Sequence, residues 1–174
     1  MGIHRTELLQ TLDGYIRQVD YHGVYEHQGD IRDAILRLKY DCEKSEAMRI
    51  ARLLHSGLDG LGTCDVATWA PTTAQRRMDR GFDQSELIAR HLASLLRVKH
   101  ARLLRRDNDG RQTGSGRTDR LARPSFKARP GIPGKHVWII DDVMTTGATM
   151  RAAAEAIVHA GACRVTCIAV SYVP

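Results

Sequence analysis

Apolar residues recur at every third or fourth position in several stretches of the chain, a spacing that predicts helices with one buried face. The predicted helices cover residues 30–38, 45–57, 84–97 and 147–160. Asp30 is the expected N-cap of the first of these helices. Gly161 stands where the glycine that ends the last helix is expected.

Short runs of apolar residues between the helices predict buried strands. They cover residues 65–70, 101–105, 137–141 and 164–172. Strands that alternate with helices indicate an α/β fold with a mostly parallel, twisted sheet flanked by helices. Ligands of such sheets bind beyond the carboxyl ends of the strands, so the loops at residues 71–81, 106–123 and 141–147 form the candidate site.

Residues 106–123 differ from the rest of the chain because they combine three glycines and many charges with almost no apolar side chain. Such a segment is too polar for a core and too long for a simple connection. We expect it to be a mobile loop with a functional role.

The net charge of +6 is concentrated in the middle of the chain, where residues 76–129 hold 15 basic and 6 acidic side chains, a net charge of +9. This distribution favours an anionic partner, either a phosphorylated small molecule or nucleic acid. A solubilising surface rich in arginine is the alternative. No apolar run approaches the ~20 residues of a membrane helix. Residues 1–20 lack the apolar stretch of a secretory signal, so we expect a cytoplasmic protein without a membrane partner.

Residues 137–149 carry the most specific chemistry in the sequence. An apolar strand ends in Asp141 and Asp142, and a short loop with Thr145, Thr146 and Gly147 leads into a helix. The start of a helix offers free backbone N–H groups and the positive end of its dipole. With the threonine hydroxyls, this arrangement is suited to bind a phosphate dianion.

The two carboxylates would repel that phosphate, so they indicate a different group beside it. Carboxylates accept charge-assisted hydrogen bonds from the hydroxyls of a sugar diol. Phosphate at the loop and a diol at the strand end together predict a ribose 5-phosphate. In the alternative interpretation, Thr145 or Thr146 only caps the helix and the aspartates only end the strand.

Residues 139–149 resemble the signature with which type I phosphoribosyltransferases bind 5-phosphoribosyl-1-pyrophosphate (PRPP). The resemblance implies that Asp141 and Asp142 hold the ribose 2- and 3-hydroxyls, and that residues 145–149 surround the 5-phosphate. The implied PRPP-binding residues are Asp141, Asp142, Val143, Met144, Thr145, Thr146, Gly147, Ala148 and Thr149.

A second stretch narrows the resemblance. Pro71 and the segment Arg-Gly-Phe-Asp-Gln at residues 80–84 resemble the corresponding motif of ComF-type phosphoribosyltransferase-like proteins, as do residues 25–40. The resemblance is to a member without the N-terminal zinc-binding segment that many relatives carry. This chain departs from the family pattern in the loop near Phe126, and at the positions Trp69, Asp83, Asp109 and Arg123.

The resemblance also implies roles for residues outside the signature. The implied pyrophosphate loop comprises Ala70, Pro71, Thr72, Thr73 and Arg76. The implied flexible loop contributes Arg105, Arg106, Arg111, Arg117 and Arg120. The implied catalytic residues are Asp141, Asp142, Arg80 and Gln112. Mg²⁺ is the implied cofactor, and it would be carried by PRPP near the two aspartates.

The expected activity is transfer of a phosphoribosyl group from PRPP to a small-molecule acceptor, expected to be a nitrogen compound, with release of pyrophosphate. A non-catalytic PRPP sensor and a factor for uptake of single-stranded DNA are the alternatives, although stacking aromatic residues are sparse. Relatives often dimerise, so a homodimer is a candidate assembly. Residues 59–174 would form the phosphoribosyltransferase-like core, on which residues 1–58 pack as a small N-terminal extension or hood.

Overall fold

The computed structural model describes residues 2–107 and 124–174 of the chain. Six strands form the main sheet in the order β1-β2-β8-β7-β3-β4. All neighbouring strands are parallel except β1 and β2, which confirms the predicted mostly parallel sheet. The strands are β1 (Ile3–Gln10), β2 (Ile16–Glu26), β3 (Val66–Trp69), β4 (Lys99–His100), β7 (His136–Met144) and β8 (Arg164–Tyr172).

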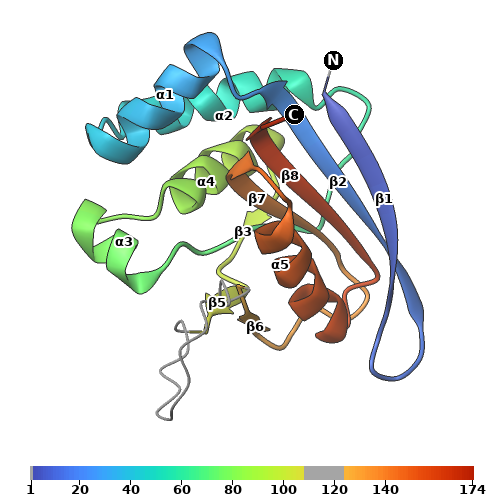
Figure 1. Cartoon of the computed structure of the whole chain (residues 1–174). Helices are drawn as coiled ribbons and strands as arrows, with labels where there is room; N and C mark the ends of the chain where they lie inside the picture. The colour runs from blue at the N-terminus through green and yellow to red at the C-terminus, as the bar shows by residue number, and fades with distance from the viewer. Residues whose placement is uncertain (1, 108–123) are drawn as a thin grey trace.

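The helices cover both faces of this sheet, as predicted for an α/β fold. Helices α1, α2 and α4 lie on one face and α5 lies on the other, while α3 stands at one end of the molecule (Figure 1). The helices are α1 (Gly29–Tyr40), α2 (Ser45–Gly57), α3 (Ala74–Arg80), α4 (Gln84–Leu96) and α5 (Ala148–His159).

Strand β7 shows why the middle of the sheet forms. Its residues Val137 and Ile139 belong to the apolar core on the α5 side, whereas Trp138 and Ile140 belong to the core under α1, α2 and α4. All four side chains are fully buried. A parallel strand covered by helices on both faces needs such an unbroken apolar run. The same run brings the polar residues that follow it to the carboxyl edge of the sheet.

Several predicted boundaries differ from the structure. Helix α2 has the predicted bounds, but Gln28 rather than Asp30 is the N-cap of α1, and Asp30 lies in the first turn. The predicted strand at residues 101–105 is wrong. Lys99 and His100 pair with β3, after which the chain leaves the main sheet and forms β5 (Leu104–Arg106) with β6 (Phe126–Ala128).

The first two strands were not predicted as a pair, although residues 13 and 14 carry the Asp-Gly sequence typical of hairpin turns. Gly14 has a φ of 89°, a left-handed conformation that glycine adopts without strain. Strand β2 then pairs in parallel with β8, so residues 3–26 extend the main sheet rather than standing apart from it. No helix in the described part of the chain is long and apolar enough to cross a membrane.

A buried carboxylate fastens this hairpin to β8. Asp20 accepts hydrogen bonds from Thr6 on β1 (2.8 Å), from Gln18 (2.9 Å) and from Arg164 on β8 (3.0 Å). Burial alone would raise the pKa of Asp20. The three hydrogen bonds and the charge of Arg164 outweigh it and lower the pKa to about 2.

We therefore predict that Asp20→Asn lowers the free energy of unfolding by about 2 kcal/mol at pH 7. Because the folded-state pKa is lowered, this contribution is present above the unfolded pKa of about 3.9 and is lost as the pH falls towards about 2. Urea unfolding of the two proteins between pH 7 and pH 3 would measure it, with exposed Asp59→Asn as the control. The prediction would be contradicted if the difference in the free energy of unfolding between the two proteins stayed constant from pH 7 to pH 3.

Candidate functional site

The site lies at the carboxyl edge of three neighbouring parallel strands, where β3 ends and β7 and β8 continue past it. The register pairs Trp69 of β3 with Ile140 of β7, and Asp141 with Ala169 of β8. The backbone N–H of Ala70 donates to the carbonyl of Ile140 (3.0 Å). The predicted pyrophosphate loop, residues 70–73, therefore begins beside the two adjacent aspartates.

The predicted 5-phosphate loop follows directly from β7, which runs to Met144 and not only to Asp141 as predicted. Thr145 and Thr146 are exposed, and Gly147 has a φ of 75° at the N-cap of α5. The hydroxyl of Thr146 accepts a long hydrogen bond from the N–H of Ala148 (3.4 Å). One hydroxyl thus takes a capping contact, while the exposed turn precedes a helix whose first N–H groups attract anions.

Asp141 is held by the start of α4. Its Oδ1 atom accepts hydrogen bonds from the Ser85 hydroxyl (2.9 Å) and from the N–H of Asp142 (2.9 Å). Burial and the neighbouring negative charge of Asp142 raise the pKa of Asp141, and the bond from Ser85 only partly opposes them. The two carboxylates therefore form an electrostatically unfavourable acidic pair, which a hydroxyl donor or a cation would stabilise.

Asp142 is buried at 5% exposure and has an unsatisfied oxygen. Its Oδ1 atom forms an ion pair with Lys39 Nζ of α1 at 3.1 Å. Its Oδ2 atom has no hydrogen-bond partner among the described residues. A buried acceptor without a donor costs about 1–3 kcal/mol, so this atom marks a place for a ligand group.

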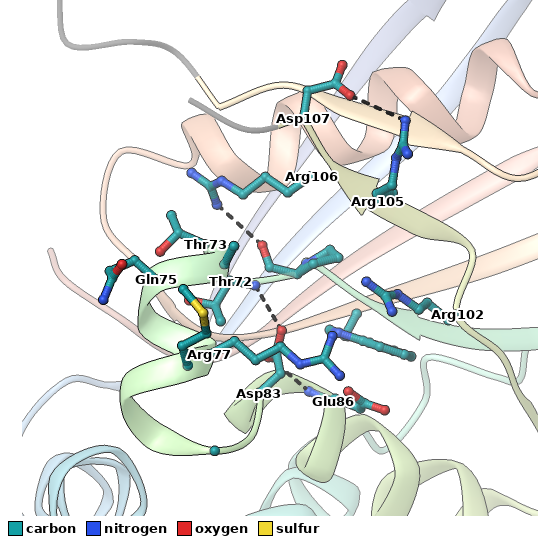
Figure 2. Close-up of a pocket in the computed structure, with 15 residues that line it drawn as sticks. Thr72, Thr73, Gln75, Arg77, Asp83, Glu86, Arg102, Arg105, Arg106 and Asp107 are labelled. Carbon is teal, nitrogen blue, oxygen red and sulfur yellow. Dashed lines mark hydrogen bonds and ion pairs between the residues drawn. The ribbon is translucent and has the colours of Figure 1, made fainter. Parts of the chain in front are cut away.

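A cavity of about 770 Å³, here called the α3 cavity, opens between the pyrophosphate loop and β5 (Figure 2). It is lined by residues from five parts of the chain: β3, the loop and helix after it, the start of α4, the segment before β5, and β5 itself. Its lining includes Trp69, Pro71, Thr72, Thr73, Arg77, Asp83, Glu86, Arg102, Arg105, Arg106 and Asp107. Four arginines give this cavity the chemistry of an anion site.

Asp83 shapes the wall of the α3 cavity. Its Oδ1 atom accepts from the N–H groups of Ser85 (3.1 Å) and Glu86 (3.4 Å), which caps α4. Its Oδ2 atom accepts from the N–H of Thr72 (2.9 Å). Burial raises the pKa of Asp83 against the opposing hydrogen bonds from Thr72 and Glu86. The carboxylate thus ties the pyrophosphate loop to α4.

The predicted arginines have different surroundings. Arg106 donates to the carbonyl of Pro71 (3.3 Å), and Arg105 lies 4.0 Å from Asp107. Arg80 lies over the Tyr40 ring at 5.4 Å and donates to Gln84 (2.9 Å), so α1 and α4 engage it. Arg76 and Arg80 do not line the α3 cavity, whereas Arg77 and Arg102, which the sequence analysis did not single out, do. Arg111, Gln112, Arg117 and Arg120 lie outside the described residues.

A second cavity of about 560 Å³, here called the α5 cavity, opens beside the predicted 5-phosphate loop. Residues 144–148 line it together with Arg5 and Tyr21 of the hairpin and Arg151 of α5. Arg151 Nη2 pairs with Glu7 at 2.9 Å. The 5-phosphate loop therefore opens into this cavity and the pyrophosphate loop into the α3 cavity. In the described part of the chain, no group of three or more His, Cys, Asp or Glu residues could hold a metal ion.

The fold and this arrangement of loops define a phosphoribosyltransferase-like protein, and the comparisons agree. The family described as the phosphoribosyl transferase domain matches residues 83–174, more than half of the chain, which therefore belongs to this family. The matched part contains the acidic pair and the 5-phosphate loop. It begins at Asp83, so β1, β2, α1, α2 and α3 precede it.

Among known proteins, the chain is similar to ComF-type relatives. It is 32% identical over 93 residues to the competence protein ComFC of Bacillus subtilis (strain 168), covering 52% of this chain and 37% of ComFC. It is 28% identical over 152 residues to the DNA utilization protein YhgH of Escherichia coli (strain K12), covering 82% of this chain and 67% of YhgH. The match to ComFC thus spans little more than a third of that protein.

Two solved structures share the fold. The allosteric regulatory enzyme of purine biosynthesis superimposes with a TM-score of 0.51 at 20% identity, covering 73% of this chain and 26% of that chain. Glutamine PRPP amidotransferase from B. subtilis, complexed with ADP and GMP, gives a TM-score of 0.52 at the same identity and coverage. Both likenesses concern the fold, and they agree with the α/β architecture predicted from the sequence.

The contacts of Asp83 predict the effects of two substitutions. Asp83→Ala should lower the free energy of unfolding by about 2 kcal/mol, because α4 loses its cap and the Thr72 N–H loses its acceptor. Asp83→Asn should lower the free energy of unfolding by less, since the amide keeps one acceptor oxygen and with it either the cap of α4 or the contact to the Thr72 N–H. Urea unfolding and amide exchange at Thr72 and Glu86 would measure both effects. Exposed Asp79→Ala is the control, and equal stability of all variants would contradict the assignment.

Proposed function

We propose that this protein binds PRPP at the carboxyl edge of β3 and β7 and transfers its phosphoribosyl group to a small-molecule acceptor. The observation that carries the proposal is the acidic pair Asp141 and Asp142, which lies between the predicted 5-phosphate and pyrophosphate loops. One of its carboxylate oxygens has no partner in the described part of the chain. A ribose 5-phosphate that carries pyrophosphate on C1 has its charged groups and hydroxyls in the same order.

In the proposed complex, the 5-phosphate binds the turn at residues 145–149 and the start of α5. The ribose hydroxyls donate to Asp141 and Asp142, whose negative charges need such donors. The pyrophosphate extends towards residues 70–73 and the arginines of the α3 cavity. Among these arginines, Arg77 follows the loop closely in sequence, and Arg106 donates a hydrogen bond to the carbonyl of Pro71 within it.

Mg²⁺ is the proposed cofactor. The residues fit it, because two carboxylates are adjacent and the Oδ2 atom of Asp142 lacks a partner among residues 2–107 and 124–174. Asp141 and Asp142 would hold it through the ribose diol, and it would neutralise charge on the departing pyrophosphate.

The residues of this chain then serve mainly to position and to stabilise charge. The transition state of such a transfer resembles an oxocarbenium ion, as in glycoside cleavage. The protein must align the acceptor with ribose C1 and stabilise the leaving pyrophosphate, for which arginines are well suited. An acceptor with a nitrogen nucleophile would enter beside C1, and pyrophosphate would leave as the C1–O bond breaks.

Two alternatives use the same surfaces. A PRPP sensor would keep the binding residues without turnover. A single-stranded nucleic acid is favoured by one observation, the concentration of Arg77, Arg102, Arg105 and Arg106 around one cavity. Release of pyrophosphate from PRPP, screened with nucleobases and amines, distinguishes the enzyme from both alternatives.

The acidic pair gives the first test of PRPP binding. Asp141→Asn with Asp142→Asn should weaken Mg²⁺-dependent PRPP binding at least about 100-fold, because charge-assisted acceptors for the diol are lost. Isothermal titration calorimetry would measure this, and circular dichroism would check the fold. Asp33→Asn with Asp59→Asn removes the same charge from exposed positions and serves as the control. Undiminished binding by the first variant would reject the site.

The arginines of the α3 cavity give the second test. Arg77→Gln with Arg106→Gln should weaken PRPP binding about tenfold or more, while ribose 5-phosphate binding should change less than about threefold, because only PRPP carries the pyrophosphate. Arg52→Gln with Arg129→Gln, two exposed positions outside the cavity lining, is the control. If the variant instead loses salt-sensitive binding of a single-stranded oligonucleotide and binds PRPP normally, the nucleic-acid alternative is supported.

A further inference from the structure

Lys39 is a basic residue beside the acidic pair for which the sequence analysis gave no role. It lies in the last turn of α1, and its Nζ atom is 3.1 Å from Oδ1 of Asp142. The two side chains are 17% and 7% exposed, so the pair is largely removed from water. Lys39 also precedes the segment that matches the phosphoribosyl transferase domain family, which begins at residue 83.

The position of Lys39 is built by the packing of α1. Ile31, Ala34, Ile35 and Leu38 bury one face of this helix in the core that it shares with α2 and α4. The next residue, Tyr40, lies under the guanidinium of Arg80 at 5.4 Å. The end of α1 is therefore held against the end of α3, and the ion pair with Asp142 places the lysine at the end of β7.

A purely structural ion pair explains these contacts incompletely. Burying two charges costs desolvation energy that is recovered only when their remaining hydrogen-bonding groups are satisfied. Here the Oδ2 atom of Asp142 has no hydrogen-bond partner among the residues that the structure describes. The Lys39 ammonium has three N–H donors, and in the described part of the chain Asp142 is the one residue with which it forms an ion pair. An unused acceptor and unused donors therefore lie next to each other.

A sugar hydroxyl is the group that satisfies both, because it donates one hydrogen bond and accepts others. A phosphate oxygen would meet the carboxylate with the wrong charge, and an amine would leave the ammonium unsatisfied. Lys39 keeps some exposure at the carboxyl edge of the sheet, so a ligand reaches the ion pair from its side.

We propose that Lys39 is a ligand-binding residue of the phosphoribosyl site, and that one ribose hydroxyl inserts at the Lys39–Asp142 ion pair. The hydroxyl donates to the Asp142 carboxylate and accepts from the Lys39 ammonium. This inference rests on the proposed function and adds a specificity to it. The site selects ribose phosphates over their deoxy counterparts, because a missing hydroxyl leaves a buried acceptor and donor unpaired.

The test compares ribose 5-phosphate with its 2-deoxy and 3-deoxy analogues by calorimetry. Wild-type protein should bind ribose 5-phosphate at least about tenfold more tightly than one of these analogues. Lys39→Met should weaken ribose 5-phosphate binding and lower that ratio, because the hydroxyl keeps its bond to Asp142 but loses the one from the ammonium. Lys44→Met removes a charge from an exposed neighbouring lysine and should retain the ratio.

Loss of Lys39 leaves a buried carboxylate unpaired, which could prevent folding. In that case Lys39→Met is combined with Asp142→Asn and compared with Asp142→Asn alone. The double variant should bind ribose 5-phosphate more weakly, since the amide variant still has the donor at Lys39.

Three results would overturn the inference. In the first, Lys39→Met binds ribose 5-phosphate with the wild-type affinity and the wild-type preference over the deoxy analogues. In the second, Lys39→Met binds ribose 5-phosphate more weakly but with an unchanged preference. In the third, the double variant and Asp142→Asn alone bind ribose 5-phosphate with equal affinity. In each case wild-type binding of PRPP still supports the proposed function. If wild-type protein binds neither PRPP nor ribose 5-phosphate, the proposed function and this inference both fail.

Discussion

The candidate site depends on two adjacent carboxylates at the end of a fully buried strand. Such a pair is unfavourable by itself, because burial and mutual repulsion both penalise its charged form. The molecule offsets this cost from two sides. Ser85, at the start of α4, donates to Asp141, and Lys39, at the end of α1, pairs with Asp142. Both helices lie on the same face of the sheet, so their packing determines whether the acidic pair is retained in a form that receives a ligand.

The two cavities offer an anion different groups. The exposed turn before α5 has free backbone N–H groups of the kind that bind anions, and Arg5 and Arg151 line the same cavity. The α3 cavity is lined by four arginines, whose guanidinium groups come from α3, from the segment before β5 and from β5 itself. Asp83 connects the α3 cavity with the acidic pair through α4, because it caps that helix and holds the Thr72 N–H, while Ser85 of the same helix donates to Asp141.

The sequence predicted those elements whose apolar pattern is strong. The bounds of α2 and β8 agree with the structure, and so does the order of strand, turn and helix at the 5-phosphate loop. The hairpin of β1 and β2 has alternating polar residues and its pairing with β8 spans about 140 positions, so periodicity alone did not reveal it. The role of Lys39 was not predicted from the sequence either, because its partner Asp142 lies far away along the chain. Arg77 rather than Arg76 lines the α3 cavity because the register of a short helix selects the side chain, and local sequence does not report that register.

The origin of Lys39 bears on how the site is assembled. The acidic pair and the 5-phosphate loop belong to the part of the chain that matches the phosphoribosyl transferase domain family, whereas α1 precedes that part. A ligand that contacts Lys39 and Asp142 together would link the N-terminal helices to the sheet edge. Its binding energy would then depend on the packing of Ile35 and Leu38 as much as on the loop itself. Under this view, residues before the matched segment contribute to selecting the sugar, while the matched segment supplies the phosphate site.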